Sequence, residues 1–189
     1  GHNVDVLAIE TPKYTASKKD IDKYTNSSYT YQAIFVDTTV KLMTAAYSFL
    51  RNAPYHVERF ENNKVKKQLQ SMLKSKQYDI ILFETLYMTP YLQICRKFSK
   101  ATCVLRSHNI EHQIWERLKN NETNLLKKLY LTQLTNALKR YEQQHLDKYD
   151  AIACISQGEV QYYNSFINLN KIKVVPFGVE IQNTKINNE

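Results

Sequence analysis

Three residues in one short segment have the types and the spacing of a metal-dependent hydrolase site. His108, Glu111 and His112, within "RSHNIEHQIWERL", form the pattern H-x-x-E-H. On a single helix this spacing places two imidazoles one turn apart with a carboxylate beside them, an arrangement that binds zinc and activates water. A zinc hydrolase that uses these three residues is therefore one hypothesis for the function.

The residues just before this pattern favour a different role for His108. Residues 102–107 are apolar and rich in β-branched side chains, which predicts a buried strand rather than the first turn of a helix. His108 then stands at the carboxyl end of a strand, where open α/β sheets bind their ligands, and it shares no helix with His112. Glu142 and Glu159 remain as candidate third ligands, but no spacing marks either, and we predict no metal. The structural alternative is that His108 caps the next helix or hydrogen-bonds in the core.

Other polar residues occupy the same kind of position. Glu84 follows the apolar run "DIILF", Ser156 follows "AIACI", and Arg106 precedes His108 by two residues, on the same side of an extended strand. Because the carboxyl ends of parallel strands converge on one crevice, we expect these side chains to lie near His108 and to bind substrate. Each also has a structural explanation: Ser156 as a helix cap, Glu84 at a helix start, and Arg106 in an ion pair.

Short apolar runs alternate along the chain with longer segments of helical period, which is typical of βαβ units. The predicted strands are 4–9, 33–36, 56–60, 79–83, 102–107, 151–155 and 173–175. The predicted helices are 39–51, 64–76, 85–99, 114–147 with a break near 120–121, and 157–166, the last starting at a capping box of Ser156 and Glu159. We therefore predict an α/β fold: a Rossmann-like parallel sheet with helices on both faces.

Composition limits the class of protein. The chain has 189 residues, 43% of them hydrophobic, which is enough for one domain or for one domain of a larger protein. Its apolar runs are too short for a membrane span and its start does not resemble a signal peptide, so we expect a cytoplasmic protein. Cys95, Cys103 and Cys154 lie in apolar segments without C-x-x-C spacing, which indicates reduced, buried thiols. The net charge of +8 comes from scattered cations, which predicts no nucleic-acid partner but leaves a phosphorylated ligand or an anionic membrane open.

Five segments resemble, in the same order, the amino-terminal domain of bacterial family 4 glycosyltransferases, which are retaining enzymes of the GT-B class. The segments are "GHNVDVLAI", "YDIILFETLYMTPYL", "RSHNIEHQIWERL", "LKRYEQQHLDKYDAIACIS" and "VVPFGVE". The resemblance covers nearly the whole chain. It implies one half of a two-domain enzyme, in which the first domain mainly holds the acceptor and the second domain holds a nucleotide-sugar.

The resemblance also implies the domain limits and the site. Residues 1–175 match the Rossmann-like acceptor-side domain, and residues 176–189 match the start of the linker to a donor-binding domain that the sequence does not contain. The start "GHNV" matches the family's second strand, so either the first strand, its glycine-rich loop and the first helix are absent, or the register at this end differs. His108 matches the histidine that the family places near the reacting sugar, with Asn109 and Glu111 positioned to orient the acceptor or the histidine. The resemblance implies no cofactor beyond the nucleotide-sugar co-substrate and a glycan or lipid-linked acceptor, and it implies that this domain is inactive alone.

The helical segment 124–147 carries one further prediction. Its apolar residues are Leu125, Leu129, Leu134, Leu138 and Tyr141, and the cations Lys127, Lys128, Lys139 and Arg140 lie among them. Enzymes of the resembled family often work at the inner membrane surface. A basic amphipathic helix can bind such a surface peripherally, whereas the alternative is a core-packing helix with a solvated face. A third hypothesis for the whole protein, besides a transferase and a hydrolase, is a binding domain without catalysis.

Overall fold

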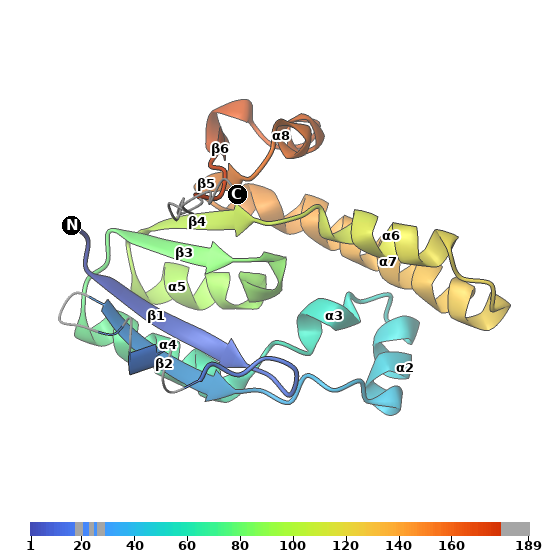
Figure 1. The fold of residues 1–189 in the computed structure, drawn as a ribbon, viewed down its shortest axis with the longest axis horizontal. Coiled ribbons are helices and arrows are strands. Elements are labelled where there is room, and N and C mark those ends of the chain that lie inside the picture. The colour runs from blue at the N-terminus through green and yellow to red at the C-terminus, as the bar shows by residue number, and fades with distance from the viewer. Residues whose placement is uncertain (18–20, 23–24, 26–28, 179–189) are drawn as a thin grey trace, which may run out of the picture.

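The computed structural model describes residues 1–17, 21–22, 25 and 29–178, and it shows strands and helices alternating along the chain (Figure 1). The elements, in chain order, are β1 (Val4–Glu10), β2 (Tyr29–Phe35), α2 (Leu42–Leu50), α3 (Tyr55–Glu58), α4 (Asn63–Ser75), β3 (Ile80–Glu84), η1 (Leu86–Tyr91), α5 (Leu92–Phe98), β4 (Thr102–Ser107), α6 (Glu111–Asn120), α7 (Leu125–His145), η2 (Leu146–Lys148), β5 (Ala151–Cys154), α8 (Gln157–Tyr163), η3 (Leu169–Lys171) and β6 (Ile172–Val174). Most of the predicted linker, residues 179–189, lies outside the described residues.

All described strand pairs are parallel, which confirms the predicted Rossmann-like α/β fold. One sheet has the order β3-β4-β5-β6, and a second sheet pairs β1 with β2. The strands thus form two sheets rather than one, and each sheet is built from strands that are consecutive in the chain. β4 has the predicted bounds, while β2 begins four residues earlier than the predicted 33–36.

One predicted strand is wrong. Residues 56–60 alternate as a strand would, but Tyr55–Glu58 forms the short helix α3, in which the N–H of Arg59 donates to the carbonyl of Tyr55. Tyr55, His56 and Val57 are all buried, although a half-buried strand would expose the middle one. The His56 ring stacks on Trp115 with centroids 3.9 Å apart. Burial of three consecutive side chains, including the stack of His56 on Trp115, therefore outweighs the strand-like alternation of a segment that is only five residues long.

The core lies against one face of the four-stranded sheet. Phe83, Leu105 and Ile152 are nearly fully buried and lie in register across β3, β4 and β5. Phe83 meets Tyr149 edge to face, with centroids 5.2 Å apart. On the opposite face of β3, Ile80 is 61% exposed and Leu82 is 48% exposed, so the two faces are buried unequally.

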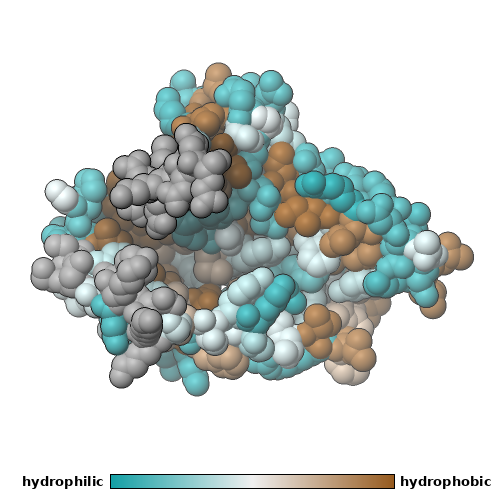
Figure 2. Space-filling view, in the orientation of Figure 1, coloured by the Kyte–Doolittle hydropathy of each residue, from teal (hydrophilic) through white to brown (hydrophobic). Residues whose placement is uncertain are grey.

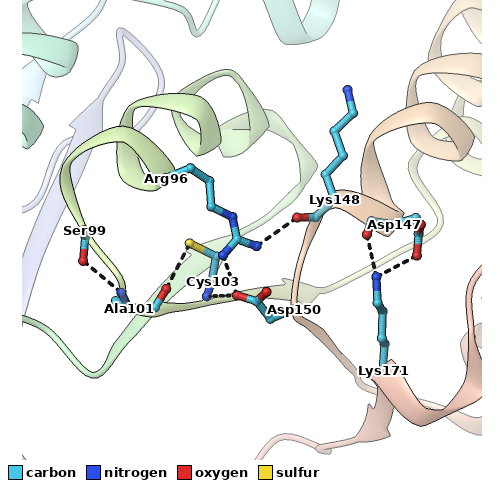
Figure 3. Close-up of polar contacts among 8 residues, drawn as sticks. All are labelled: Arg96, Ser99, Ala101, Cys103, Asp147, Lys148, Asp150 and Lys171. Atoms are coloured by element: carbon cyan, nitrogen blue, oxygen red, sulfur yellow. Dashed lines mark hydrogen bonds and ion pairs between the residues drawn. The ribbon is translucent and has the colours of Figure 1, made fainter.

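A polar cluster fixes β4 and β5 at the amino edge of the sheet (Figure 3). The Asp150 carboxylate accepts hydrogen bonds from the Cys103 backbone N–H and from Nη1 of Arg96, each at 2.7 Å. Arg96 also donates to the Lys148 carbonyl at 2.9 Å. The arginine holds the pKa of the Asp150 carboxyl below its usual range, which is the direction expected for a structural ion pair. These contacts lie at the edge opposite to the candidate site.

The helical segment predicted over 114–147 forms two antiparallel helices, α6 and α7, with the break near the predicted position. Asn124 caps α7 by accepting a hydrogen bond from the Lys127 N–H at 3.0 Å. Leu134 and Leu138 are buried in the core, whereas Leu125 and Leu129 are exposed. The core-packing interpretation therefore holds for the middle of α7 and not for its first turns. Within the described part of the chain, every helix is too short or too polar to cross a bilayer.

Candidate functional site

The candidate site lies where β3 and β4 end. Glu84 is the last residue of β3, and it is in register with Arg106 on β4, so the parallel pairing places the two side chains next to each other. His108 follows β4 by one residue, before α6 begins at Glu111. The predicted convergence of Glu84, Arg106 and His108 at the carboxyl edge is thus realised by strand register.

The Glu84 carboxylate contacts both the His108 and the Arg106 side chains. Its Oε2 lies 2.6 Å from Nε2 of His108, and its Oε1 lies 3.6 Å from Nη1 of Arg106. The His108 and Arg106 side chains are 24% and 27% exposed, so both are held by the fold yet open to a ligand. Among the described residues, Nδ1 of His108 has no hydrogen-bond partner, and Nε of Arg106 is buried without one. A neutral imidazole that donates from Nε2 to a carboxylate presents Nδ1 as an acceptor.

The ring of Phe177 completes this cluster. It stacks on the His108 imidazole, with centroids 5.5 Å apart and planes 18° apart, and it lies 4.8 Å from Cζ of Arg106. Phe177 follows β6, more than sixty positions further along the chain. Its residue type and its place in "VVPFGVE" do not indicate this contact, so sequence reasoning did not find it.

Thr85, the residue after Glu84, has a strained backbone. Its φ of 85° and ψ of 155° lie in a region that is almost restricted to glycine. Its N–H donates to the Arg106 carbonyl at 3.2 Å, and its carbonyl accepts from the Met88 N–H at 3.2 Å. These bonds hold the turn from β3 into η1, and therefore hold Glu84 beside β4. The sequence gives no signal for this strain, because threonine is not a residue that favours such a conformation.

Glu111 and His112 belong to a separate, buried network. The Glu142 carboxylate on α7 accepts from the Glu111 N–H at 2.9 Å and contacts Nδ1 of His112. Glu111 in turn accepts from the hydroxyl of Tyr87 at 2.9 Å. Burial raises the pKa of the Glu111 carboxyl and, more strongly, that of the Tyr87 phenol. Glu111 is 7% exposed, so the structure buries this predicted substrate-binding residue, with its carboxylate against Tyr87 of η1, rather than placing it at the surface.

The structure separates the two histidines of the H-x-x-E-H pattern. His108 precedes α6 and contacts Glu84, whereas His112 lies within α6 and contacts Glu142. The shared helix that the zinc arrangement requires is therefore lacking. Within the described ranges, no group of three His, Cys, Asp or Glu side chains is arranged to hold a metal ion.

Two further predicted residues lie at the same edge with different surroundings. The Asn109 side chain is exposed, and its backbone carbonyl accepts from Ser107 Oγ at 3.2 Å and from the Tyr163 hydroxyl at 3.4 Å. This leaves its amide available to a ligand. Ser156 caps α8 by accepting from the Glu159 N–H at 3.4 Å, so its structural role is present. The Glu159 carboxylate, whose pKa is raised by burial, accepts from the Ile155 N–H at 2.8 Å.

Comparison of the sequence with models of protein families gave no match, and comparison with curated proteins gave none either. The chemistry of the Glu84, Arg106, His108 and Phe177 cluster is therefore the basis on which a function is assigned.

Proposed function

We propose that the chain is the acceptor-side domain of a retaining glycosyltransferase that moves a sugar from a nucleotide-sugar to a glycan or lipid-linked acceptor. The observation that carries the proposal is the cluster at the carboxyl edge, where Glu84 holds His108 beside Arg106. His108, which resembles the family histidine, lies there beside Glu84 and Arg106, at the edge where α/β sheets bind ligands. The fold alone would fit many other functions.

In the proposed reaction, His108 acts on a sugar hydroxyl. With Nε2 turned to Glu84, Nδ1 accepts a hydrogen bond from a hydroxyl of the donor sugar or of the acceptor. As the bond from the sugar to the diphosphate breaks, positive charge develops on the sugar and negative charge on the leaving phosphate. A group already oriented by a carboxylate needs no reorganisation at that moment, which is the condition for electrostatic stabilisation.

Arg106 supplies the complementary charge. Its guanidinium shares only one long contact with Glu84, at 3.6 Å, and its remaining donors match the geometry of phosphate oxygens. Asn109 supports the same reaction as an exposed amide able to orient the acceptor. We assign Glu84 the task of orienting His108, and Ser156 that of starting α8 beside the site, so neither needs to touch substrate.

The proposal requires no cofactor besides the nucleotide-sugar. In the proposed arrangement, the nucleotide is held by a second domain facing this edge, so turnover requires both domains. We place the reaction in the cytoplasm, where the reducing environment suits the free, buried thiols of Cys95, Cys103 and Cys154.

The test is release of nucleoside diphosphate from a panel of nucleotide-sugars by the two-domain protein. We expect one donor to be turned over, and we expect His108→Ala to lower kcat about a hundredfold with an unchanged melting temperature. Leu169→Ser, an exposed change on η3, is the matched control and should leave the rate unchanged.

The outcomes separate three classes of protein. Release that needs His108 and ignores a chelator supports the transferase. A normal rate in the folded His108→Ala variant would show that His108 has no role in catalysis. Loss of activity when a chelator is added would favour the zinc hydrolase hypothesis instead. No release from any donor in the presence of a panel of acceptors favours a binding domain.

A further inference from the structure

Arg59, the residue that ends α3, is a partly buried cation without a carboxylate partner. Within the part of the chain that the structure describes, it forms no ion pair. The other arginines either pair with a carboxylate or are exposed to solvent: Arg51, Arg96, Arg106, Arg117 and Arg140. Withdrawing a guanidinium from water is costly unless other groups replace its hydrogen bonds, so an arginine in this position is suited to bind an anion.

One contact orients the guanidinium of Arg59 and leaves its other edge free. Nη1 donates to the carbonyl of Thr38 at 3.2 Å, and Cζ lies 5.7 Å from the centre of the Phe60 ring. Nε is buried and, like Nη2, makes no hydrogen bond with the described residues. The edge formed by Nε and Nη2 carries two parallel N–H groups, which match two oxygens of a carboxylate or of a phosphate. The side chain as a whole is partly exposed, so a ligand can approach it from solvent.

His56 adds a second polar group without a partner on the same side of α3. It precedes Arg59 by three residues, so the two side chains project from one side of the helical turn. The imidazole is 6% exposed, and its Nδ1 makes no hydrogen bond with the described residues. Burial and, to a smaller extent, the charge of Arg59 lower the pKa of His56 to about 3, so the ring is neutral. A neutral imidazole can donate one hydrogen bond to an anion without adding a second charge.

The α3 helix lies at the edge of the molecule that carries the candidate site, beyond the carboxyl ends of β1 and β3 (Figure 1). In Figure 2 the middle of this face, below the α6 and α7 pair, is mainly teal to white, so polar side chains reach the surface there. Tyr87 connects α3 to the site, because its ring stacks on Phe60 with centroids 5.1 Å apart and its hydroxyl donates to Glu111. Glu111 begins α6 three residues after His108.

We propose that Arg59 and His56 bind an anionic group of the acceptor, a carboxylate or a phosphate, while His108 acts on a sugar hydroxyl. Arg106 is then left for the diphosphate of the donor, so the two arginines bind different substrates. The description of the ligand as an acceptor rests on the proposed transferase, whereas the anion site itself does not. The proposal adds that the acceptor is negatively charged, which neither the α/β fold nor the family resemblance specifies.

The experiment measures binding of small anions to the chain by titration calorimetry and by the fluorescence of Trp115. Trp115 is the only tryptophan, and it stacks on His56, so its emission reports on this part of the molecule. The probes are glucuronate, glucose 1-phosphate and, as the neutral control, glucose. We expect at least one anion to bind and to change the emission, and we expect glucose to do neither. Stronger binding of glucuronate would indicate a carboxylate on the acceptor, and stronger binding of glucose 1-phosphate would indicate a phosphate.

Variants locate the bound anion. We expect Arg59→Gln, which loses the charge, to weaken binding about thirtyfold, and Arg59→Lys, which keeps the charge without the paired donors, about tenfold. His56→Phe keeps an aromatic ring against Trp115 and should weaken binding about fivefold. The control Arg117→Gln changes an exposed arginine of α6 that donates to the Gln113 carbonyl at 3.3 Å, and it should bind like wild type.

Each outcome decides the proposal. Binding that Arg59→Gln loses and Arg117→Gln keeps supports it, provided that circular dichroism shows the variants folded; if Arg59→Gln does not fold, Arg59→Lys decides. Absence of anion binding by both methods overturns the proposal, as does binding that the Arg59 variants retain. Binding that Arg106→Gln loses instead would place the anion at the Glu84 cluster and also overturns it.

Turnover of nucleotide-sugars by the two-domain protein is measured separately, so failure of this proposal is distinguishable from failure of the transferase. Turnover that needs His108, without anion binding, supports the transferase and overturns only the charged acceptor. Anion binding that needs Arg59, without turnover of any donor, supports the anion site and argues against the transferase.

Discussion

Nε2 of His108 and Oε2 of Glu84 lie 2.6 Å apart, although the two residues belong to different strand ends separated by 24 positions in the chain. The contact exists because β3 and β4 are parallel and in register, so that Glu84 reaches past Arg106 to the residue that follows the neighbouring strand. A carboxylate in this position fixes the ring orientation of the imidazole. It also directs the free Nδ1 away from Glu84.

The first prediction concerns this orientation and rests on the proposed transferase. Replacing the carboxylate by an amide keeps a neutral hydrogen bond to His108 but loses its charge assistance. We expect Glu84→Gln to lower kcat about fivefold and Glu84→Ala roughly thirtyfold, with little change in KM for the donor. The Glu84 side chain is 48% exposed, so neither change should lower stability by more than about 1 kcal/mol. Equal rates in wild type and Glu84→Ala would remove the orienting role.

The second prediction concerns the buried carboxylate of Glu142. Its removal leaves His112 and the Glu111 N–H without a partner between α6 and α7, so Glu142→Ala should lower the free energy of unfolding by about 3–5 kcal/mol. Glu142→Gln keeps part of the hydrogen bonding and should cost about 1–2 kcal/mol. Urea unfolding measures both values. The control is Glu116→Ala on α6, whose exposed pair with Lys119 at 3.4 Å should be worth less than about 0.5 kcal/mol. Similar losses for Glu142→Ala and Glu116→Ala would contradict the buried network.

The third prediction uses the strain at Thr85. Glycine adopts a φ of 85° without steric cost, and this gain exceeds the extra entropy that glycine loses on folding. We expect Thr85→Gly to raise the free energy of unfolding by about 1 kcal/mol. Asn52, at a φ of 58°, is the control, because asparagine tolerates that region and Asn52→Gly should change little. If thermal unfolding shows that Thr85→Gly destabilises the protein, the backbone there is not strained.

The fourth prediction concerns pH and Asp5 on β1. Hydrogen bonds from Lys76, Thr30 and Tyr78 lower the pKa of the Asp5 carboxyl to about 2 in the folded state. Because the unfolded pKa is about 3.9, the ionised carboxylate stabilises the fold above that pH, and this contribution is lost as the pH falls toward 2. The side chain is 11% exposed, so Asp5→Asn should cost on the order of 1–2 kcal/mol near neutral pH and progressively less in acid.

Urea unfolding of wild type and Asp5→Asn at several pH values checks this difference. Asp37 provides the control, since its pKa is also lowered to about 2, chiefly by Thr39, but its contacts are local and its side chain is exposed. Asp37→Asn should therefore change stability much less than Asp5→Asn. A cost for Asp5→Asn that stays constant between pH 7 and pH 3 would show that the carboxylate charge is not what stabilises β1.

The α/β class and the positions of Glu84, Arg106 and His108 were predictable from the sequence. A buried parallel strand such as β3 or β5 appears as an uninterrupted apolar run, so the position of its carboxyl end can be located from the sequence. Parallel pairing then follows from the alternation of strands and helices, and it places the carboxyl ends of neighbouring strands at one edge whatever their separation in the chain. The reduced state and burial of the three cysteines follow from the same apolar runs.

Only the tertiary structure decided which partners these residues take. Glu111 and His112 resemble site residues in the sequence, yet the Glu111 N–H and the His112 ring contact Glu142 because α7 folds back along α6, and the Glu111 carboxylate contacts Tyr87. Phe177 covers His108, and Tyr55–Glu58 is helical, for reasons that lie in distant segments. The hydrophobic periodicity of a segment indicates which of its side chains are buried, but it does not indicate which residue a buried polar group contacts. That partner depends on how the elements pack against one another, which no local pattern contains.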